Sequence, residues 1–138
     1  MPDNAPLIRP YVPRNSRRIL CVFPKGVPCF GTFHHAYPLM PGVRSVMPPL
    51  GLLTVAAYLP KEWDVQFVDE NVVAARPADY QRADVIMFSS MHAQRREVLR
   101  LNEVAHGVGK LTVLGGPSVS ACPQHGDGCR ELDRNAGL

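Results

Sequence analysis

The chain has 138 residues, of which 46% are hydrophobic and 20% are charged, and its formal net charge is +3. This length and balance predict one globular domain with a single core, and they exclude a disordered or fibrous protein. The small charge offers no basic face for nucleic acid, and no apolar stretch is long enough to cross a bilayer. We therefore expect a cytoplasmic protein that binds neither nucleic acid nor membrane.

The first elements are an arm, a strand and a long loop. Residues 1–18 carry four prolines and four arginines without a hydrophobic period, which predicts a flexible, extended arm. The apolar run Ile19–Phe23 has the length of a strand covered on both faces, as in a parallel sheet. Residues 24–47 show no period but contain three aromatic residues, so we expect a functional loop that packs onto another part of the molecule.

A helix is predicted from Leu50 to Leu59, directly after two prolines that suit an unpaired first turn. Apolar residues recur along one face at spacings of three and four, and Leu53 and Ala57 extend the apolar surface around the helix. We therefore expect this helix to be covered nearly all round. At roughly 15 Å it is too short for a membrane and has the right length to lie across a sheet.

The remaining elements alternate in type. Strands are predicted at 65–68, 85–88 and 111–114, with helices at 78–82 and 94–106. This order predicts right-handed βαβ units and an α/β fold, with an open parallel sheet and helices on both faces. We find no fifth strand after Ser120, so we expect a sheet that is truncated at its carboxyl-terminal end and an irregular tail over 122–138.

Ligands of such sheets bind outside the carboxyl ends of the strands. These ends are small, polar or rich in glycine, and they comprise Pro24–Gly26, Asp69–Asn71, Ser89–His92 and Gly115–Ser118. Gly115 and Gly116 let a planar or phosphate group approach the backbone, although a tight strand-to-loop turn explains them equally. Ser89 and Ser90 offer hydroxyl groups to a nucleotide-like ligand, or alternatively cap the next helix.

Other sites lack the residues that they require. The four cysteines are separated by 8, 93 and 7 positions, which matches neither CxxC nor CxxxCxxC, so we expect free thiols and no iron–sulfur cluster. His34 and His35 lack the spacing of a zinc site, and we predict no metal held by protein ligands. A phosphoacceptor pocket or a dinucleotide site would need carboxylates or GxGxxG after the first strand, and both are missing.

Six features of the sequence occur together: the long aromatic loop and the segments "ILCVFP", "MPPLGLLTVAAYLP", "VQFVDEN", "DVIMFSSM" and "LTVLGGPSVSA". Over about residues 19–121 they resemble the N-terminal cobalamin-binding domain of B12-dependent radical S-adenosylmethionine (SAM) enzymes. The Pro-Pro-Leu-Gly-Leu helix start and the later Gly-Gly-Pro are the most specific parts. The resemblance implies a flavodoxin-like (Rossmann-like) fold that binds cobalamin, with the nucleotide tail of the cofactor between the sheet and the helices.

The resemblance also assigns residues to the cofactor: Pro24, Lys25, Gly26, Gly51, Ser89, Ser90, Met91, Gly115, Gly116 and Pro117. Gly51 would keep backbone bulk away from the ligand, unless it serves only the packing of the helix on the sheet. Many cobalamin domains ligate cobalt with a histidine from D-x-H-x-x-G after the first strand. This chain has "PKGVPCFG" there, so the resemblance implies binding without that histidine, with His34 or His35 as the alternative ligand.

Full-length members of that family continue into a radical SAM domain whose CxxxCxxC binds the cluster. This chain contains no such motif. We therefore expect a module or fragment that is not catalytic alone and that depends on a separate radical SAM chain or a further domain for methyl transfer. Two alternatives stay open: a non-catalytic interaction domain that keeps the fold without cofactor, and a nucleotide-binding regulatory domain.

Overall fold

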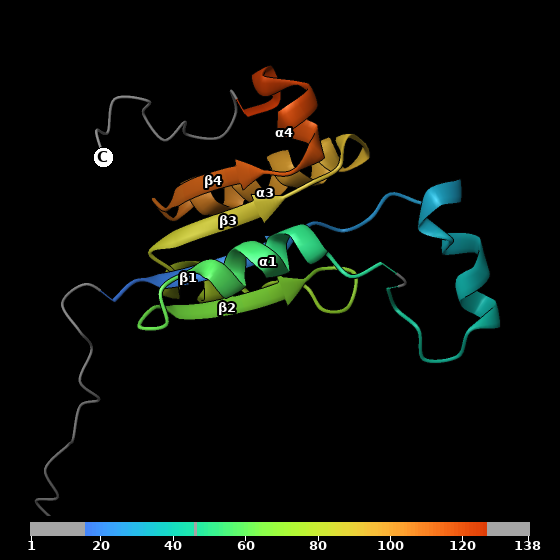
Figure 1. Ribbon diagram of the computed structural model, residues 1–138, viewed down its shortest axis with the longest axis horizontal. Helices are drawn as coiled ribbons and strands as arrows, with labels where there is room; N and C mark the ends of the chain where they lie inside the picture. The colour runs from blue at the N-terminus through green and yellow to red at the C-terminus, as the bar shows by residue number, and fades with distance from the viewer. Residues whose placement is uncertain (1–15, 46, 127–138) are drawn as a thin grey trace, which may run out of the picture.

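The computed structural model describes residues 16–45 and 47–126 (Figure 1). Its centre is a four-stranded sheet in the order β2-β1-β3-β4, and every strand pair is parallel. The strands are β1 (Arg18–Phe23), β2 (Asp64–Asp69), β3 (Val85–Ser89) and β4 (Leu111–Gly115). Each lies within one residue of its predicted bounds, so the predicted α/β, flavodoxin-like sheet is confirmed. The parts of the predicted arm and tail at 1–15 and 127–138 lie outside the described residues.

Helices cover both faces of the sheet. They are α1 (Leu50–Tyr58), α2 (Pro77–Arg82), α3 (Arg95–Gly107) and α4 (Pro117–Ala121), with short 3-10 turns at Phe30–Thr32, His34–Leu39, His92–Gln94 and Pro123–Gly126. Figure 1 shows α1 in front of the sheet and α3 behind it. The sequence did not predict α4, although Gly116 followed by Pro117 is a common way to begin a helix. None of the described helices is long and apolar enough to cross a membrane.

The strands divide the core into two clusters because successive side chains point to opposite faces. Leu20 and Val22 of β1 pack with Phe88, Tyr80 and Leu101 on the face covered by α2 and α3. The other face is smaller, and its buried residues are Ile19, Cys21 and Leu52. Since β1 lies between β2 and β3, its side chains are buried on both faces, as the continuous apolar run predicted.

The expectation that α1 is covered nearly all round is wrong. Leu52 is the only buried residue of α1, while Leu50 is 67% exposed and Tyr58 is 86% exposed. Leu52 packs with residues of β1, β2 and the start of β3. On the same face, Val113 of β4 pairs with Met87 and is only partly buried. An apolar strip of sheet therefore borders α1.

The loop after β1 is also less packed than its aromatic residues predicted. Phe30 is 94% exposed and Phe33 is 52% exposed, and their ring centroids lie 6.4 Å apart. The prediction that this loop packs onto the rest of the molecule is wrong for these two residues. Tyr37 is half-buried and lines a hollow at the carboxyl edge of the sheet.

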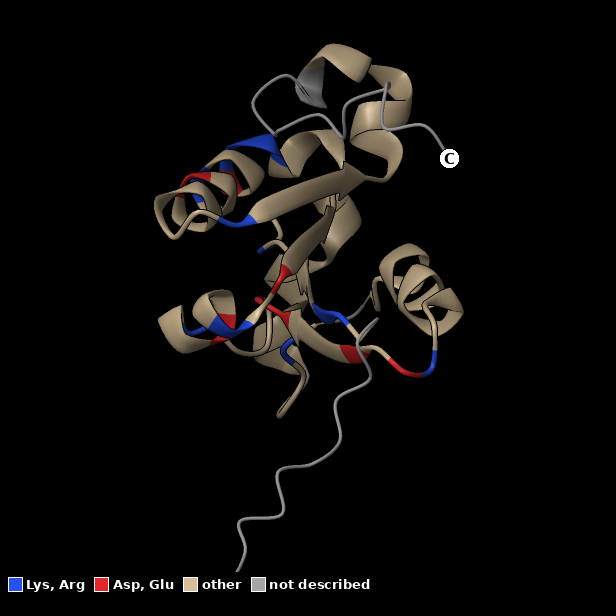
Figure 2. Cartoon of the chain, turned by 90° about the vertical axis from the view of Figure 1, so that its left-hand side faces the viewer, with Lys and Arg blue, Asp and Glu red and all other residues tan. Residues whose placement is uncertain are grey.

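An ion pair joins the amino ends of β1 and β3. Figure 2 views the sheet from this side. The Arg18 side chain lies 2.8 Å from Asp84 Oδ1, and the Arg18 backbone N–H donates to Asp84 Oδ2 at 2.8 Å. These hydrogen bonds lower the pKa of Asp84 from 3.8 to about 2. Because the folded pKa is the lower one, the stabilisation is present above about pH 4 and is lost as the pH falls toward 2.

We therefore expect the urea midpoint of the wild-type chain to fall between about pH 4 and pH 2, and to fall less in Asp84→Asn. The substitution keeps an oxygen acceptor for the Arg18 backbone but removes the charge that titrates. Some acid dependence will persist in the variant, since the pKa of Asp79 is also depressed, mainly by hydrogen bonds from Arg76 and Gln66. Equal falls in both proteins would contradict the assignment to Asp84.

Candidate cofactor site

A cleft of about 290 Å³ lies between α1 and the carboxyl ends of β3 and β4. Its lining residues are Gly51, Leu52, Val55, Met87, Phe88, Ser89, Val113, Gly115 and Gly116. All of their side chains except that of Ser89 are apolar. The cleft thus brings together Gly51, Ser89, Gly115 and Gly116, which the sequence assigned to one ligand from three separate segments. It opens along the apolar strip that α1 leaves uncovered.

Two glycines keep this cleft open. An added Cβ would meet no atom within 4 Å at Gly51 or at Gly115. The alternative that Gly51 serves only helix–sheet packing is therefore wrong, because no strand lies close enough to need a glycine there. Gly51 and Val55 are one helical turn apart and face the same cleft. A larger side chain at position 51 would project into the space beside Val55.

Gly116 has a different role, which is structural. Its φ is +96° and its ψ is −178°, and an added Cβ would lie 2.7 Å from Ser89 Oγ and 3.0 Å from Ser90 N. Two backbone hydrogen bonds tie the β3 and β4 ends together here, from Ser90 N to Gly115 O at 3.3 Å and from Ser118 N to Ser90 O at 3.1 Å. Only glycine allows the two strand ends to approach this closely.

Ser89 and Ser90 do not cap the turn that comes after them, so that alternative is wrong. The N-cap of the 3-10 turn is Met91, and the acceptor for its backbone N–H is Gln94 Oε1 at 2.9 Å. Ser90 is 2% exposed and lies beneath the Gly115–Gly116 backbone, whereas Ser89 lies at the surface of the cleft. The serine pair therefore supplies one hydroxyl group to the cleft wall, from Ser89.

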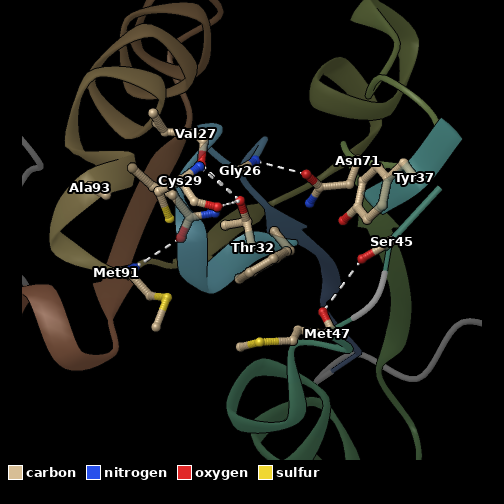
Figure 3. A pocket seen from close by; sticks show the side chains of 12 residues that line it. Gly26, Val27, Cys29, Thr32, Tyr37, Ser45, Met47, Asn71, Met91 and Ala93 are labelled. Atoms are coloured by element: carbon tan, nitrogen blue, oxygen red, sulfur yellow. Dashed lines mark hydrogen bonds between the residues drawn. The ribbon is translucent and has the colours of Figure 1, made fainter. Parts of the chain in front are cut away.

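A second hollow, of about 90 Å³, lies at the ends of β1, β2 and β3 beneath the long loop (Figure 3). It is lined by Phe23, Gly26, Val27, Cys29, Thr32, Tyr37, Ser45, Met47, Asn71, Met91, Ala93 and Gln94. The predicted residues Gly26 and Met91 lie here, outside the first cleft. Pro24 is buried below it, and Lys25 faces a separate hollow that His34 and Glu97 also line. Pro117 is exposed at the start of α4.

Sequence reasoning missed two residues of the second hollow. Asn71 Oδ1 accepts a hydrogen bond from the Gly26 backbone N–H at 2.7 Å, and Gln94 Nε2 donates to the Pro24 carbonyl at 2.7 Å. The sequence places Asn71 at a strand end without a role, and Gln94 only at the start of a helix. Both side chains hydrogen-bond to backbone atoms, and the amino-acid sequence does not indicate which backbone atoms a side chain will bind.

The thiols of the described cysteines differ in environment. Cys29 is exposed, and a hydrogen bond with Thr32 lowers its pKa from the usual value near 9. Burial under α1 raises the pKa of Cys21 to about 11. Cys29 is thus more reactive than Cys21 and lies at the second hollow. Within the described ranges no three His, Cys, Asp or Glu side chains are grouped so that they could hold a metal ion.

Known proteins resemble the chain in this same region. The family model of the B12 binding domain matches residues 39–131. The hopanoid C-2 methylase of Rhodopseudomonas palustris is 54% identical over 112 residues, which are 81% of this chain and 21% of that protein. An uncharacterized methyltransferase of Synechocystis is 36% identical over 106 residues, 77% of this chain and 20% of that protein. The bacteriochlorophyllide d C-12(1)-methyltransferase of Chlorobaculum tepidum is 32% identical over 72 residues, 52% of this chain and 16% of that protein.

The chain spans about a fifth of the length of the first two of these relatives. No solved structure matches it. The family match begins in the loop before α1 and continues through α1, β2, β3 and β4, so it includes every residue of the glycine-lined cleft. It covers well over half of the chain and agrees with the parallel sheet described above. The chain belongs to the B12 binding domain family.

Proposed function

We propose that the chain is the cobalamin-binding module of a B12-dependent radical SAM methyltransferase-type protein, and that residues 19–121 form the binding unit. The observation that carries this proposal is the cleft in which Gly51, Ser89, Gly115 and Gly116 meet, in a chain of the B12 binding domain family. Methyl transfer by the larger protein is supported by the names of the relatives, one methylase and two methyltransferases. The iron–sulfur cluster would come from a separate radical SAM chain or domain.

The residues at the cleft fit a part of cobalamin that is flat and mainly apolar. Open space at Gly51 and Gly115 lets such a group contact the backbone, and the Ser89 hydroxyl can hydrogen-bond at the edge. Burying an apolar group against Leu52, Val55 and Val113 stabilises the complex by about 25 cal/mol per Å² of apolar surface. Bound cobalamin supplies a cobalt ion that can accept and donate a methyl group. The chain's own residues hold the cofactor and keep water from its buried part.

We propose that the loop after β1 contacts the cofactor and that its first turn supplies no histidine ligand to cobalt. The segment "PKGVPCFG" contains no histidine, and His34 lines the hollow beside Lys25 and Glu97, outside the cleft. Lys25, Gly26 and Met91 would then contact the cofactor from the ends of β1 and β3. The free thiols of Cys21, Cys29 and Cys122 support a reducing compartment such as the cytoplasm.

Retention of hydroxocobalamin tests the proposal. The purified chain is mixed with an excess of hydroxocobalamin, desalted and examined by visible absorbance, and we expect about one equivalent to remain. Thermal shift with adenine and guanine nucleotides serves as the comparison, because a nucleotide-binding regulatory domain would be stabilised by nucleotides and not by cobalamin. A cooperative melt with no retained cobalamin and no shift would favour the cofactor-free interaction domain.

Cys29 gives a local readout of the same proposal. We expect bound cyanocobalamin to slow the alkylation of Cys29 by iodoacetamide at pH 8, since this exposed thiol lines the hollow at the strand ends. Peptide mass spectrometry with and without the cofactor gives the rate at each cysteine. Cys21 is the internal control, because burial keeps it slow in both samples. An unchanged rate at Cys29 under saturating cofactor would remove the second hollow from the site.

A further inference from the structure

We propose that Gln94 and Asn71 are positioning residues that fix the backbone of Pro24–Gly26 in place before cobalamin binds. This inference rests on the proposed function and adds residues that the sequence did not assign to the cofactor. The segment concerned is the first part of the loop after β1 and lies along the second hollow (Figure 3). Asn71 and Gln94 reach it from beyond the carboxyl ends of β2 and β3, the two strands that flank β1.

Gln94 joins the ends of β1 and β3 through one buried amide. The residue is 4% exposed, its Nε2 donates to Pro24 O at 2.7 Å, and its Oε1 accepts from Met91 N at 2.9 Å. The register of paired residues between β1 and β3 ends at Val22 and Phe88. Beyond that pair, Pro24 has no N–H with which to continue the sheet. The Gln94 side chain therefore provides the link between the strand ends that the backbone does not.

Asn71 makes the matching connection from β2. Its Oδ1 accepts from the Gly26 backbone N–H at 2.7 Å, and its Nδ2 donates to Asp69 Oδ1 at 2.8 Å. The same Nδ2 reaches the Pro24 carbonyl at 3.4 Å. The Pro24 carbonyl thus receives amide donors from both neighbouring strand ends. Figure 3 shows Asn71 pointing toward Gly26.

These bonds matter because the next part of the chain has little regular structure. From Lys25 to Pro49 the described residues contain only short 3-10 turns, and both Phe30 and Phe33 are exposed. Without the two amides, Pro24–Gly26 would move with this loop, and binding would have to order it. A site that is already ordered avoids that entropy cost and holds its ligand longer. Gln94 and Asn71 thereby slow dissociation of the cofactor.

The test compares two variants of Gln94 with a matched control. Gln94→Met removes both bonds with little change in volume, and Gln94→Glu keeps the acceptor for Met91 N while losing the donor to Pro24 O. The control is Gln66→Met, which removes a side-chain bond to Asp79 in the body of the sheet. Dissociation of hydroxocobalamin is followed by visible absorbance after dilution, at a temperature where melting curves show each protein folded.

We expect Gln94→Glu to release cobalamin about tenfold faster than the wild type, since a lost hydrogen bond contributes up to a factor of about ten, and Gln94→Met, which loses both bonds, to release it at least as fast. Gln66→Met should release it at the wild-type rate even where its melting temperature falls. If Gln94→Met does not fold, Gln94→Glu and Asn71→Ala carry the same expectation. If the wild type binds cobalamin and the folded variants release it at rates within twofold of the wild-type rate, the inference alone is overturned. If the wild type does not bind cobalamin, the proposed function and the inference are overturned together.

Discussion

Replacing Gly51 with leucine is expected to reduce the affinity for hydroxocobalamin at least about 100-fold without weakening the fold. The new side chain would project from the first turn of α1 into the cleft beside Val55, where a Cβ meets no protein atom. In the free protein the substitution stabilises α1 by up to about 0.8 kcal/mol, since leucine has a higher helix propensity than glycine. The bound state loses the space that the ligand needs, and overpacking costs about 1–3 kcal/mol or more.

Gly107→Leu is the matched control for this prediction. Gly107 ends α3, and an added Cβ there also meets nothing within 4 Å, but the residue does not line the cleft. Titration with hydroxocobalamin and urea unfolding are measured for both variants. Normal binding by Gly51→Leu would mean that the ligand does not occupy the cleft. Loss of binding by Gly107→Leu as well would mean that the effect is not local.

Gly116→Ala is expected to have the largest effect on stability, a loss of roughly 3–5 kcal/mol. Part of it is backbone strain, because alanine rarely adopts φ +96° with ψ −178°, a conformation that costs about 1–3 kcal/mol. The rest is steric, since the new Cβ would lie 3.0 Å from both Ser90 N and Ser90 O, which backbone hydrogen bonds to Gly115 and Ser118 hold in place. Relief of the clash would move β3 and β4 apart and open the edge of the cleft.

Gly109→Ala separates the two contributions. Gly109 has φ +70°, but an added Cβ there meets nothing within 4 Å, so only the strain of a positive φ remains, about 1–2 kcal/mol. Urea unfolding at pH 7 gives both values. Equal losses in the two variants would contradict the close approach of Gly116 to β3, whereas a clearly greater loss in Gly116→Ala is expected.

The sheet was predictable because each strand is a short, mainly apolar stretch bounded by proline, glycine or polar residues. The β1 run Ile19–Phe23 has no polar side chain, and the fold places it between two other strands with both faces buried. The exposure of α1 was not predictable, because apolar periodicity identifies a helical face but does not say how many elements cover it. The five-residue helix α4 is too short to show a period at all.

The candidate site likewise contains residues that could be predicted from the sequence and residues that could not. The resemblance to cobalamin-binding domains assigned Gly51. Ser89, Gly115 and Gly116 were predictable because small residues at parallel strand ends meet at one edge of the sheet. Gln94 and Asn71 were not, because their partners are backbone atoms 70 and 45 positions away. Such contacts depend on how the strand ends are arranged in space, and side-chain type alone does not reveal them.

A crystal structure of the chain grown with hydroxocobalamin is the most direct test of where the vitamin lies. We predict its nucleotide arm between α1 and the β3–β4 surface, in contact with the Gly115 backbone and in reach of the Ser89 hydroxyl. The corrin ring should rest over the ends of β1 and β3. Density for the vitamin only on the α2–α3 side of the sheet, or a cleft filled by protein side chains in the complex, would contradict this placement.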